Sequence, residues 1–152
     1  MYRERSRSCL ETAVQLLSRR DHGRAELFRK LLTKGFAEDE VSHAIQSCEQ
    51  HGYLDDTRYV QGMIRHHIAK GHGELRIQQT LKQKQIDETV VAEQLALTDV
   101  DWFELARSTA ERKFGEQITT KDPKVYAKQV RFLQYRGFNF EQIQYALDSR
   151  DQ

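Results

Sequence analysis

The acidic pair Asp55 and Asp56 is the first place in this chain where chemistry could be sought. Both carboxylates lie in HGYLDDTRYV, residues 51–60. Adjacent carboxylates can share a proton or bind a metal, but Asp is also a preferred N-cap of a helix. A helical apolar pattern follows at once. We therefore expect Asp55 to be the N-cap, Asp56 to favour the positive helix end, and Leu54 and Tyr59 to form a hydrophobic staple.

Three histidines in HHIAKGH also invite a metal interpretation. On a helix, however, His66 and His67 point about 100° apart, and the motif holds no Cys or acidic ligand beside them and His72. We expect hydrogen-bonding or partner-contacting histidines, and we predict no metal and no cofactor.

The stretch AKGHGELRI, residues 69–77, places Gly71 and Gly73 just before a helix start. Two interpretations stay open. The exposed amides could cradle a phosphate, as in the hairpin of helix-hairpin-helix DNA-binding proteins. Alternatively the stretch is a plain turn between helices, which Glu74 favours because its charge opposes an anion.

No catalytic motif accompanies these residues. The spacing supports neither a Ser/His/Asp nor a Cys/His arrangement, and the P-loop and dinucleotide fingerprints do not occur. We therefore predict that the protein is not an enzyme. Cys9 and Cys48 are too few for a disulfide scaffold, so we expect reduced core thiols in a soluble cytoplasmic protein without signal peptide or membrane span.

The elements that carry these residues are predicted to be helices. The 152 residues include one proline and eight glycines, and apolar residues recur at helical spacing without a convincing strand alternation. With 38% hydrophobic and 31% charged residues, the chain predicts a thin core and a long molecule.

An internal repeat organises the pattern. Three windows align without gaps at offsets of 50 and 52 residues: KLLTKGFAEDEVSHAI (30–45), TLKQKQIDETVVAEQL (80–95) and FLQYRGFNFEQIQYAL (132–147). Each window predicts a helix end, a tight turn and a second helix. The glycine of KGF and RGF suits a left-handed backbone, whereas Gln85 replaces it in the middle copy, where we expect the helix to close differently.

A further helix precedes each window, at about 8–20, 55–70 and 101–114. The spacing of Ser8 and Glu11 predicts a capping box, and Asp122 before Pro123 predicts a helix start. The predicted fold is therefore all-α, with three tandem three-helix repeats (1–50, 51–98 and 99–152) in an elongated, curved array.

Charge is segregated along each repeat although the net charge is only +1. Residues 19–36 carry six Lys/Arg and two Asp/Glu. Residues 61–86 carry five Lys/Arg and one Asp/Glu, and so do residues 121–138. Each of the three segments therefore has a net charge of +4. The third helices are acidic. If the second helices line one face, their basic residues could follow phosphates or an acidic protein groove; the alternative is that these are solvated helix faces.

The candidate partner-binding or DNA-binding residues are the cations of this basic stripe: Arg19, Arg20, Arg24, Arg29, Lys34, Arg65, Lys70, Arg76, Lys82, Lys84, Lys124, Lys128, Arg131 and Arg136. Aromatic residues at helical spacing are expected to pack in the core. Tyr135, beside Arg136, is the one for which base stacking is also considered.

Four motifs in order resemble the RecX family, regulators of the RecA recombinase: SRRDHGRAELFRKL (18–31), GYLDDTRYV (52–60), KGHGELRI (70–77) and RGFNFEQI (136–143). The resemblance covers roughly residues 8–148. Gly23 stands where the family often has Ser, and Glu74 where it usually has Pro.

The resemblance implies an all-helical chain of three tandem three-helix units that binds the RecA–DNA filament in its helical groove. We expect it to be a monomer. Such a protein is expected to limit filament extension, strand exchange, ATP hydrolysis by RecA and the coprotease activity that triggers the SOS response. The alternative function is a helical module that binds bare single- or double-stranded DNA.

Overall fold

The computed structural model describes residues 7–148, which form nine α-helices, one short 3-10 helix and no strand. The elements are α1 (Cys9–Arg19), α2 (Arg24–Thr33), α3 (Glu38–Gln50), α4 (Asp56–Ala69), α5 (Glu74–Gln83), α6 (Glu88–Leu97), α7 (Trp102–Phe114), η1 (Gly115–Gln117), α8 (Pro123–Tyr135) and α9 (Phe140–Asp148). The all-α prediction is confirmed. Within this described range, none of the helices combines the length and the apolar character needed to span a bilayer.

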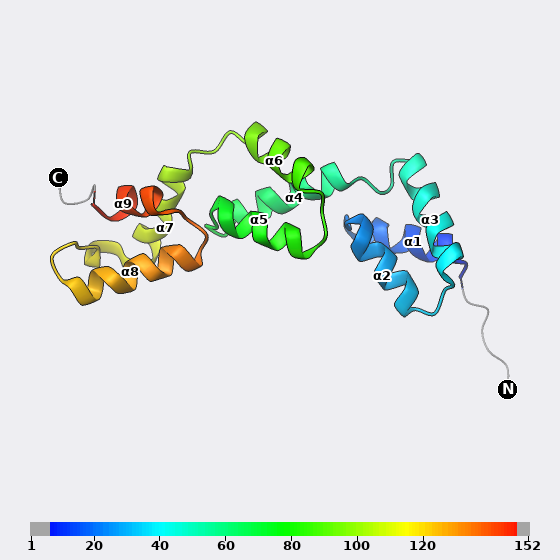
Figure 1. Ribbon diagram of the computed structural model, residues 1–152, viewed down its shortest axis with the longest axis horizontal. Helices are drawn as coiled ribbons and strands as arrows, with labels where there is room; N and C mark the ends of the chain where they lie inside the picture. Colours follow the sequence, from blue (N-terminus) through cyan, green and yellow to red (C-terminus); the bar gives the residue numbers. More distant parts are fainter. Residues whose placement is uncertain (1–6, 149–152) are drawn as a thin grey trace.

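The helices group into three repeats that lie in a row, with the chain termini at opposite ends (Figure 1). The first repeat is α1–α3, the second α4–α6 and the third α7–α9. In each repeat the first helix packs mainly against the third. In this view the second helices α2, α5 and α8 all lie toward the lower edge of the row. The predicted elongated array of three-helix repeats is confirmed.

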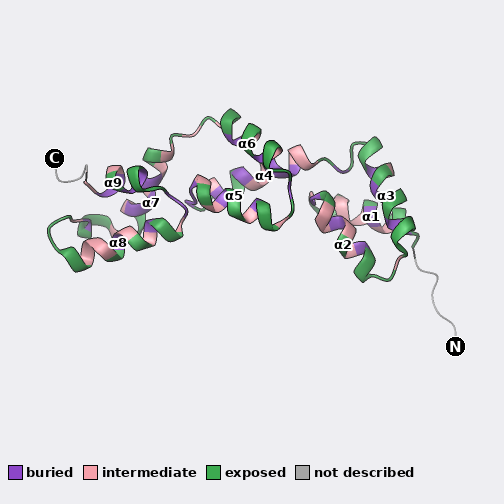
Figure 2. Cartoon of the chain, viewed as in Figure 1, coloured by how far each residue is buried: buried purple, intermediate pink, exposed green. Residues whose placement is uncertain are grey.

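Every repeat has its own small hydrophobic core, and buried residues face inward within each group of helices (Figure 2). Leu31, Leu81 and Leu133, equivalent positions of the three sequence windows, are all fully buried. Cys9 and Cys48 are buried free thiols in the first core, as predicted. Three separate cores explain how a weakly hydrophobic chain folds, because no single large core has to be filled.

The predicted helix starts are present. Ser8 Oγ accepts from the N–H of Glu11 at 3.1 Å while the Glu11 carboxylate accepts from the N–H of Ser8 at 2.8 Å. Asp122 caps α8, with Pro123 in its first turn. These side chains accept amide hydrogens that have no partner inside their own helices.

The turn after each second helix has the same backbone conformation in all three repeats. Gly35 and Gly137 have φ of 100° and 99°, and Gln85 has φ of 61°. The following residue donates its N–H back to the helix in every copy, from Ile86 to Leu81 O at 3.1 Å in the middle one. The expectation that this copy closes differently is therefore wrong.

A contact from the neighbouring repeat accompanies the unusual residue in the middle turn. Gln85 Oε1 accepts a hydrogen bond from Arg29 Nη2 at 2.9 Å. This bond offsets part of the cost of a non-glycine residue with positive φ.

The predicted repeat boundaries, after residues 50 and 98, fall at the ends of α3 and α6 and stay predictions. Leu54 and Tyr59, expected to pair as a hydrophobic staple, belong instead to the first and second core clusters respectively. The short segment that joins the repeats is thus held in both cores.

Candidate functional site

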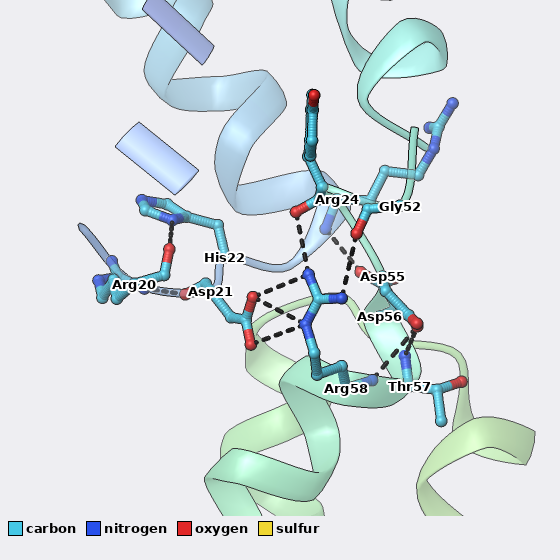
Figure 3. A network of polar contacts seen from close by, with 10 residues as sticks. Arg20, Asp21, His22, Arg24, Gly52, Asp55, Asp56, Thr57 and Arg58 are labelled. Atoms are coloured by element: carbon cyan, nitrogen blue, oxygen red, sulfur yellow. Dashed lines mark hydrogen bonds and ion pairs between the residues drawn. The ribbon is translucent and has the colours of Figure 1, made fainter. Parts of the chain in front are cut away.

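The two carboxylates of the acidic pair have separate structural roles. Asp55 Oδ1 accepts from the backbone N–H groups of Thr57 at 2.9 Å and Arg58 at 3.2 Å, so the predicted N-cap is confirmed. Asp56 turns to the preceding repeat, where its Oδ1 accepts from the N–H of Arg24 at 2.8 Å (Figure 3). Among the described residues there is no group of three or more His, Cys, Asp or Glu side chains that could hold a metal ion.

The first inter-repeat interface joins α2 to the start of α4 and to the turn at residues 84–86. The N-cap of α2 is Gly23, which has no side chain to cap the helix, and Asp56 supplies the missing acceptor from the next repeat. A Cβ on Gly23 would lie 3.1 Å from Ile86 Cδ1, so the two repeats approach closely at this glycine.

Ion pairs surround this first interface. Arg58 pairs with Asp21 at 3.0 Å and also donates to the carbonyl oxygens of Gly52 and Tyr53 (Figure 3). Arg24 Nε donates to Glu49 Oε2 at 3.0 Å. Because Arg58 contacts both the α1–α2 loop and the α3–α4 segment, it fixes the second repeat relative to the first.

The second inter-repeat interface joins the start of α5 to the turn at residues 136–138. The N–H of Gly73 donates to Arg136 O at 2.8 Å, and the N–H of Leu75 donates to Gly137 O at 3.1 Å. In return, Arg136 Nη1 donates to Lys70 O at 2.8 Å. A Cβ on Gly73 would overlap the Gly137 carbonyl group, so this position requires glycine.

These bonds decide between the two interpretations of AKGHGELRI. Two of the amides that a phosphate would need are already bonded to the third repeat, so the phosphate cradle is wrong and the stretch is an inter-repeat turn. The interfaces are equivalent: Gly23 and Gly73 are 50 residues apart, and each lies against the turn of the next repeat. The third repeat has Asp122 and Pro123 at the corresponding helix start.

A buried histidine precedes each of the two interface glycines. His22 Nδ1 lies 3.1 Å from Arg20 O and its Nε2 lies 3.0 Å from Lys30 Nζ. His72 Nδ1 lies 2.7 Å from His67 Nδ1, and both rings are buried. Burial lowers the pKa of His72 to about 4, and the positive charge of Arg76 contributes to that shift. The expectation of hydrogen-bonding histidines is confirmed for this pair.

Five of the fourteen candidate cations are engaged inside the protein. Arg20 forms an ion pair with Glu26 at 2.6 Å, and Arg24 forms one with Glu49. Arg29 bonds Gln85, Arg76 Nη1 donates to Tyr135 O at 3.4 Å, and Arg136 bonds Lys70 O. Arg29, Arg76 and Arg136 join neighbouring repeats, whereas Arg20 and Arg24 bond within the first repeat. The sequence pattern did not reveal these roles.

The other nine cations have no hydrogen bond or ion pair from their side chains to the described residues, and all except Lys84 are exposed. They are Arg19, Lys34, Arg65, Lys70, Lys82, Lys84, Lys124, Lys128 and Arg131. Lys34 follows α2, Lys82 and Lys84 lie at the end of α5, and Lys124, Lys128 and Arg131 lie on α8. Arg19 ends α1, Arg65 lies within α4 and Lys70 follows α4, so these three do not belong to second helices.

The sequence did contain one signal for the interfaces. The dipeptide His-Gly occurs at 22–23, 51–52 and 72–73, and its first and third copies stand at the repeat offset, directly before second helices. A glycine N-cap without a capping side chain is expected where another backbone approaches closely. The repeated dipeptide could therefore have identified the interface.

Comparison with family models gives three matches. Residues 9–48 match the first three-helix domain of RecX, residues 55–95 match the second, and residues 99–147 match the third.

Comparison with curated relatives agrees. The chain is 56% identical over 140 residues to the regulatory protein RecX of Vibrio vulnificus, covering 92% of this chain and 91% of that protein. It is 52% identical over 155 residues to the regulatory protein RecX of Vibrio parahaemolyticus, covering 100% and 99%. The crystal structure of RecX from Lactobacillus salivarius has the same fold, with a TM-score of 0.81 at 23% identity over 94% of each chain.

Proposed function

Because the chain belongs to the RecX family of regulatory proteins, we propose that it is a negative modulator of RecA that binds the RecA–DNA filament. By binding it limits filament extension, recombinase activity and coprotease activity, and so acts in homologous recombination, DNA repair and the SOS response. It does this in the cytoplasm, as a monomer with no catalysis of its own.

The observation that supports this proposal most strongly is the linear arrangement of three like units. A RecA filament presents the same surface repeatedly along a helical axis. In this protein the second helices α2, α5 and α8 lie toward one edge of the row (Figure 1). Each bears or is followed by a cation that has no ion pair within the described part of the chain. An array of this kind can contact several filament surfaces at once.

The two interfaces contribute to binding through rigidity. Contacts that are weak one by one gain affinity when the units that make them are held in a fixed order, because later contacts form at high effective concentration. Neighbouring repeats are fixed relative to one another by two close approaches, Gly23 to Ile86 and Gly73 to Gly137. We propose that Lys34, Lys82 and Lys128 make such contacts, with the other unpaired cations of the stripe beside them.

The proposal is tested by measuring binding to three targets at one salt concentration: single-stranded DNA, RecA without DNA, and the RecA–DNA filament. The filament is expected to bind most tightly, and the binding constant should fall steeply with added salt because neutralised phosphates and acidic groups release counterions. Equal affinity for bare DNA and for the filament would favour the alternative, a module that acts on DNA alone.

A further inference from the structure

Tyr135, the last residue of α8, is unusually exposed for an aromatic side chain, with 75% of its surface accessible. Exposure alone does not make a binding site, because Phe140 is also 64% exposed. Tyr135 differs in its surroundings: it lies at the second inter-repeat interface, where α5 of the second repeat meets the end of α8.

An arginine from the neighbouring repeat is placed against the Tyr135 ring. The guanidinium carbon of Arg76 lies 5.0 Å from the ring centroid, and Arg76 Nη1 donates to the Tyr135 carbonyl oxygen at 3.4 Å. This bond and the cation–π contact hold the guanidinium in place. The guanidinium therefore covers one face of the ring, and the exposed remainder of the Tyr135 ring forms an ordered, positively charged surface for a ligand.

A cavity of about 460 Å³ opens beside this surface, between α5 and the end of α8. Its polar lining is Arg76, Gln79, Thr80, Gln83, Gln134 and Tyr135. No carboxylate lines it. Within the described residues, the amide groups of Gln79, Gln83 and Gln134 form no hydrogen bond and are exposed, so they are free to donate to and accept from a ligand.

We propose that this cavity binds a nucleobase of single-stranded DNA, stacked on Tyr135 and contacted at its edge by the glutamine amides. Each part of the ligand has a counterpart: an aromatic face for the base, side-chain amides for its hydrogen-bonding edge, and Arg76 for an adjoining phosphate. Duplex DNA does not satisfy the site, because its bases are stacked on each other and have no free face.

The inference rests on the proposed function in one respect: the filament is what brings single-stranded DNA to the protein. The binding itself is measured without RecA, so its failure leaves filament binding by the lysines of α5 and α8 untouched. Conversely, loss of filament binding in the charge variants does not remove a base-stacking site.

The test is fluorescence anisotropy of a labelled single-stranded oligonucleotide with the full chain and the variants Tyr135→Ala and Tyr135→Phe, at low salt. A second oligonucleotide of equal length carries abasic sites, so that it keeps the phosphates and lacks the bases. Phe140→Ala, which removes another exposed aromatic residue close in sequence, is the matched control.

We expect Tyr135→Ala to weaken binding of the base-bearing strand at least about fivefold, and Tyr135→Phe to bind like the unmodified protein, because stacking needs the ring and not the hydroxyl group. Phe140→Ala should bind normally, and the abasic strand should not distinguish Tyr135→Ala from the unmodified protein. The proposal is overturned if the unmodified protein binds both strands equally, or if Tyr135→Ala leaves binding of the base-bearing strand unchanged.

Discussion

The Asp56 carboxylate accepts a hydrogen bond from the backbone N–H of Arg24, 32 residues earlier in the chain, at 2.8 Å. Asp56 is itself the first residue of α4, whose N-cap is Asp55, and its side chain caps the helix of the preceding repeat. Burial raises the pKa of this carboxyl group, and the Arg24 N–H opposes the shift. This bond connects the start of α4 in the second repeat to the start of α2 in the first repeat.

The first prediction concerns this bond. Asp56→Ala leaves the start of α2 without an acceptor, because Gly23 offers none, and should lower the free energy of unfolding by about 1 kcal/mol, as loss of an N-cap does. Asp56→Asn keeps an acceptor oxygen and is the matched control. The comparison is made by urea denaturation at pH 7, and equal stability of the two variants would show that the bond does not contribute.

The cap at Asp55 gives a second prediction. Asp55→Ala removes the acceptor for the N–H groups of Thr57 and Arg58 and should cost about 0.5–2 kcal/mol of stability. Filament binding should hardly change below the melting temperature, because Asp55 has no role in it. A variant with unchanged stability and strongly reduced binding would reverse this assignment.

The interface glycine Gly73 gives a third prediction. Gly73→Ala places a methyl group where the Gly137 carbonyl lies, so the second interface must open or shift, at a cost of about 1–3 kcal/mol. Gly62→Ala is the control: Gly62 is inside α4 and an added Cβ would meet only Arg65 Nη2 at 3.7 Å. That control should be as stable as the original or more stable by up to about 1 kcal/mol, because alanine favours a helix.

Small-angle X-ray scattering provides a second readout for the same pair of variants. Opening of the second interface in Gly73→Ala should change the radius of gyration, whereas Gly62→Ala should not. If thermal melting and scattering are the same for both variants, the close approach of Gly73 to Gly137 does not hold the repeats together.

The pH dependence of stability is the fourth prediction. His67 and His72 are buried with lowered pKa values, about 4 for His72 against an ordinary 6.5. The unfolded chain therefore binds protons more readily between pH 6.5 and 4, and the stability that the neutral pair provides is present above pH 6.5 and is lost as the pH falls through this window. Arg76, Arg136 and Lys70 surround His72 and disfavour its charged form further.

The measurement is the free energy of unfolding at pH 7.5 and pH 5. We expect a fall on the order of 1–2 kcal/mol from this pair. His72→Gln should reduce the fall, while replacement of the exposed His43 on α3 by Gln should leave it unchanged. An equal free energy of unfolding at pH 7.5 and pH 5 in the unmodified protein would contradict the buried, neutral state of His67 and His72.

The helices were predictable from sequence because their signals are local. Ser8 and Glu11, or Asp122 and Pro123, lie within a few residues of the helix that they start. The turn glycines Gly35 and Gly137 likewise identified the repeat. Even at Gln85, where the glycine is missing, the window pattern predicted the turn correctly and only its closure was misjudged.

The sequence could not predict which arginines bond between repeats and which cations stay unpaired, because this depends on contacts between residues far apart in sequence. Arg29 meets Gln85 across 56 residues and Arg136 meets Lys70 across 66. A count of charges cannot separate such residues from Lys82 or Lys128, which have no ion pair in the described range. The charge pattern therefore identified the basic segments, and only the fold distinguished the arginines that join repeats.

The central claim is that unpaired cations from all three repeats bind the RecA–DNA filament together. It is tested most directly by charge reversal at Lys34, Lys82 and Lys128, one residue per repeat, singly and in combination. The control triple variant reverses Arg7, Arg112 and Lys113, which lie outside the second helices, and both triple variants have the same net charge. Circular dichroism shows whether the helices are retained.

The deciding measurement is the dissociation constant for the RecA–DNA filament at fixed salt. We predict a loss of about tenfold or less for each single variant, a loss of roughly a hundredfold or more for the Lys34→Glu, Lys82→Glu, Lys128→Glu combination, and a change within about threefold for the control combination. Equal losses in the two triple variants, or full affinity in the first, would contradict the claim that the three repeats bind through these cations.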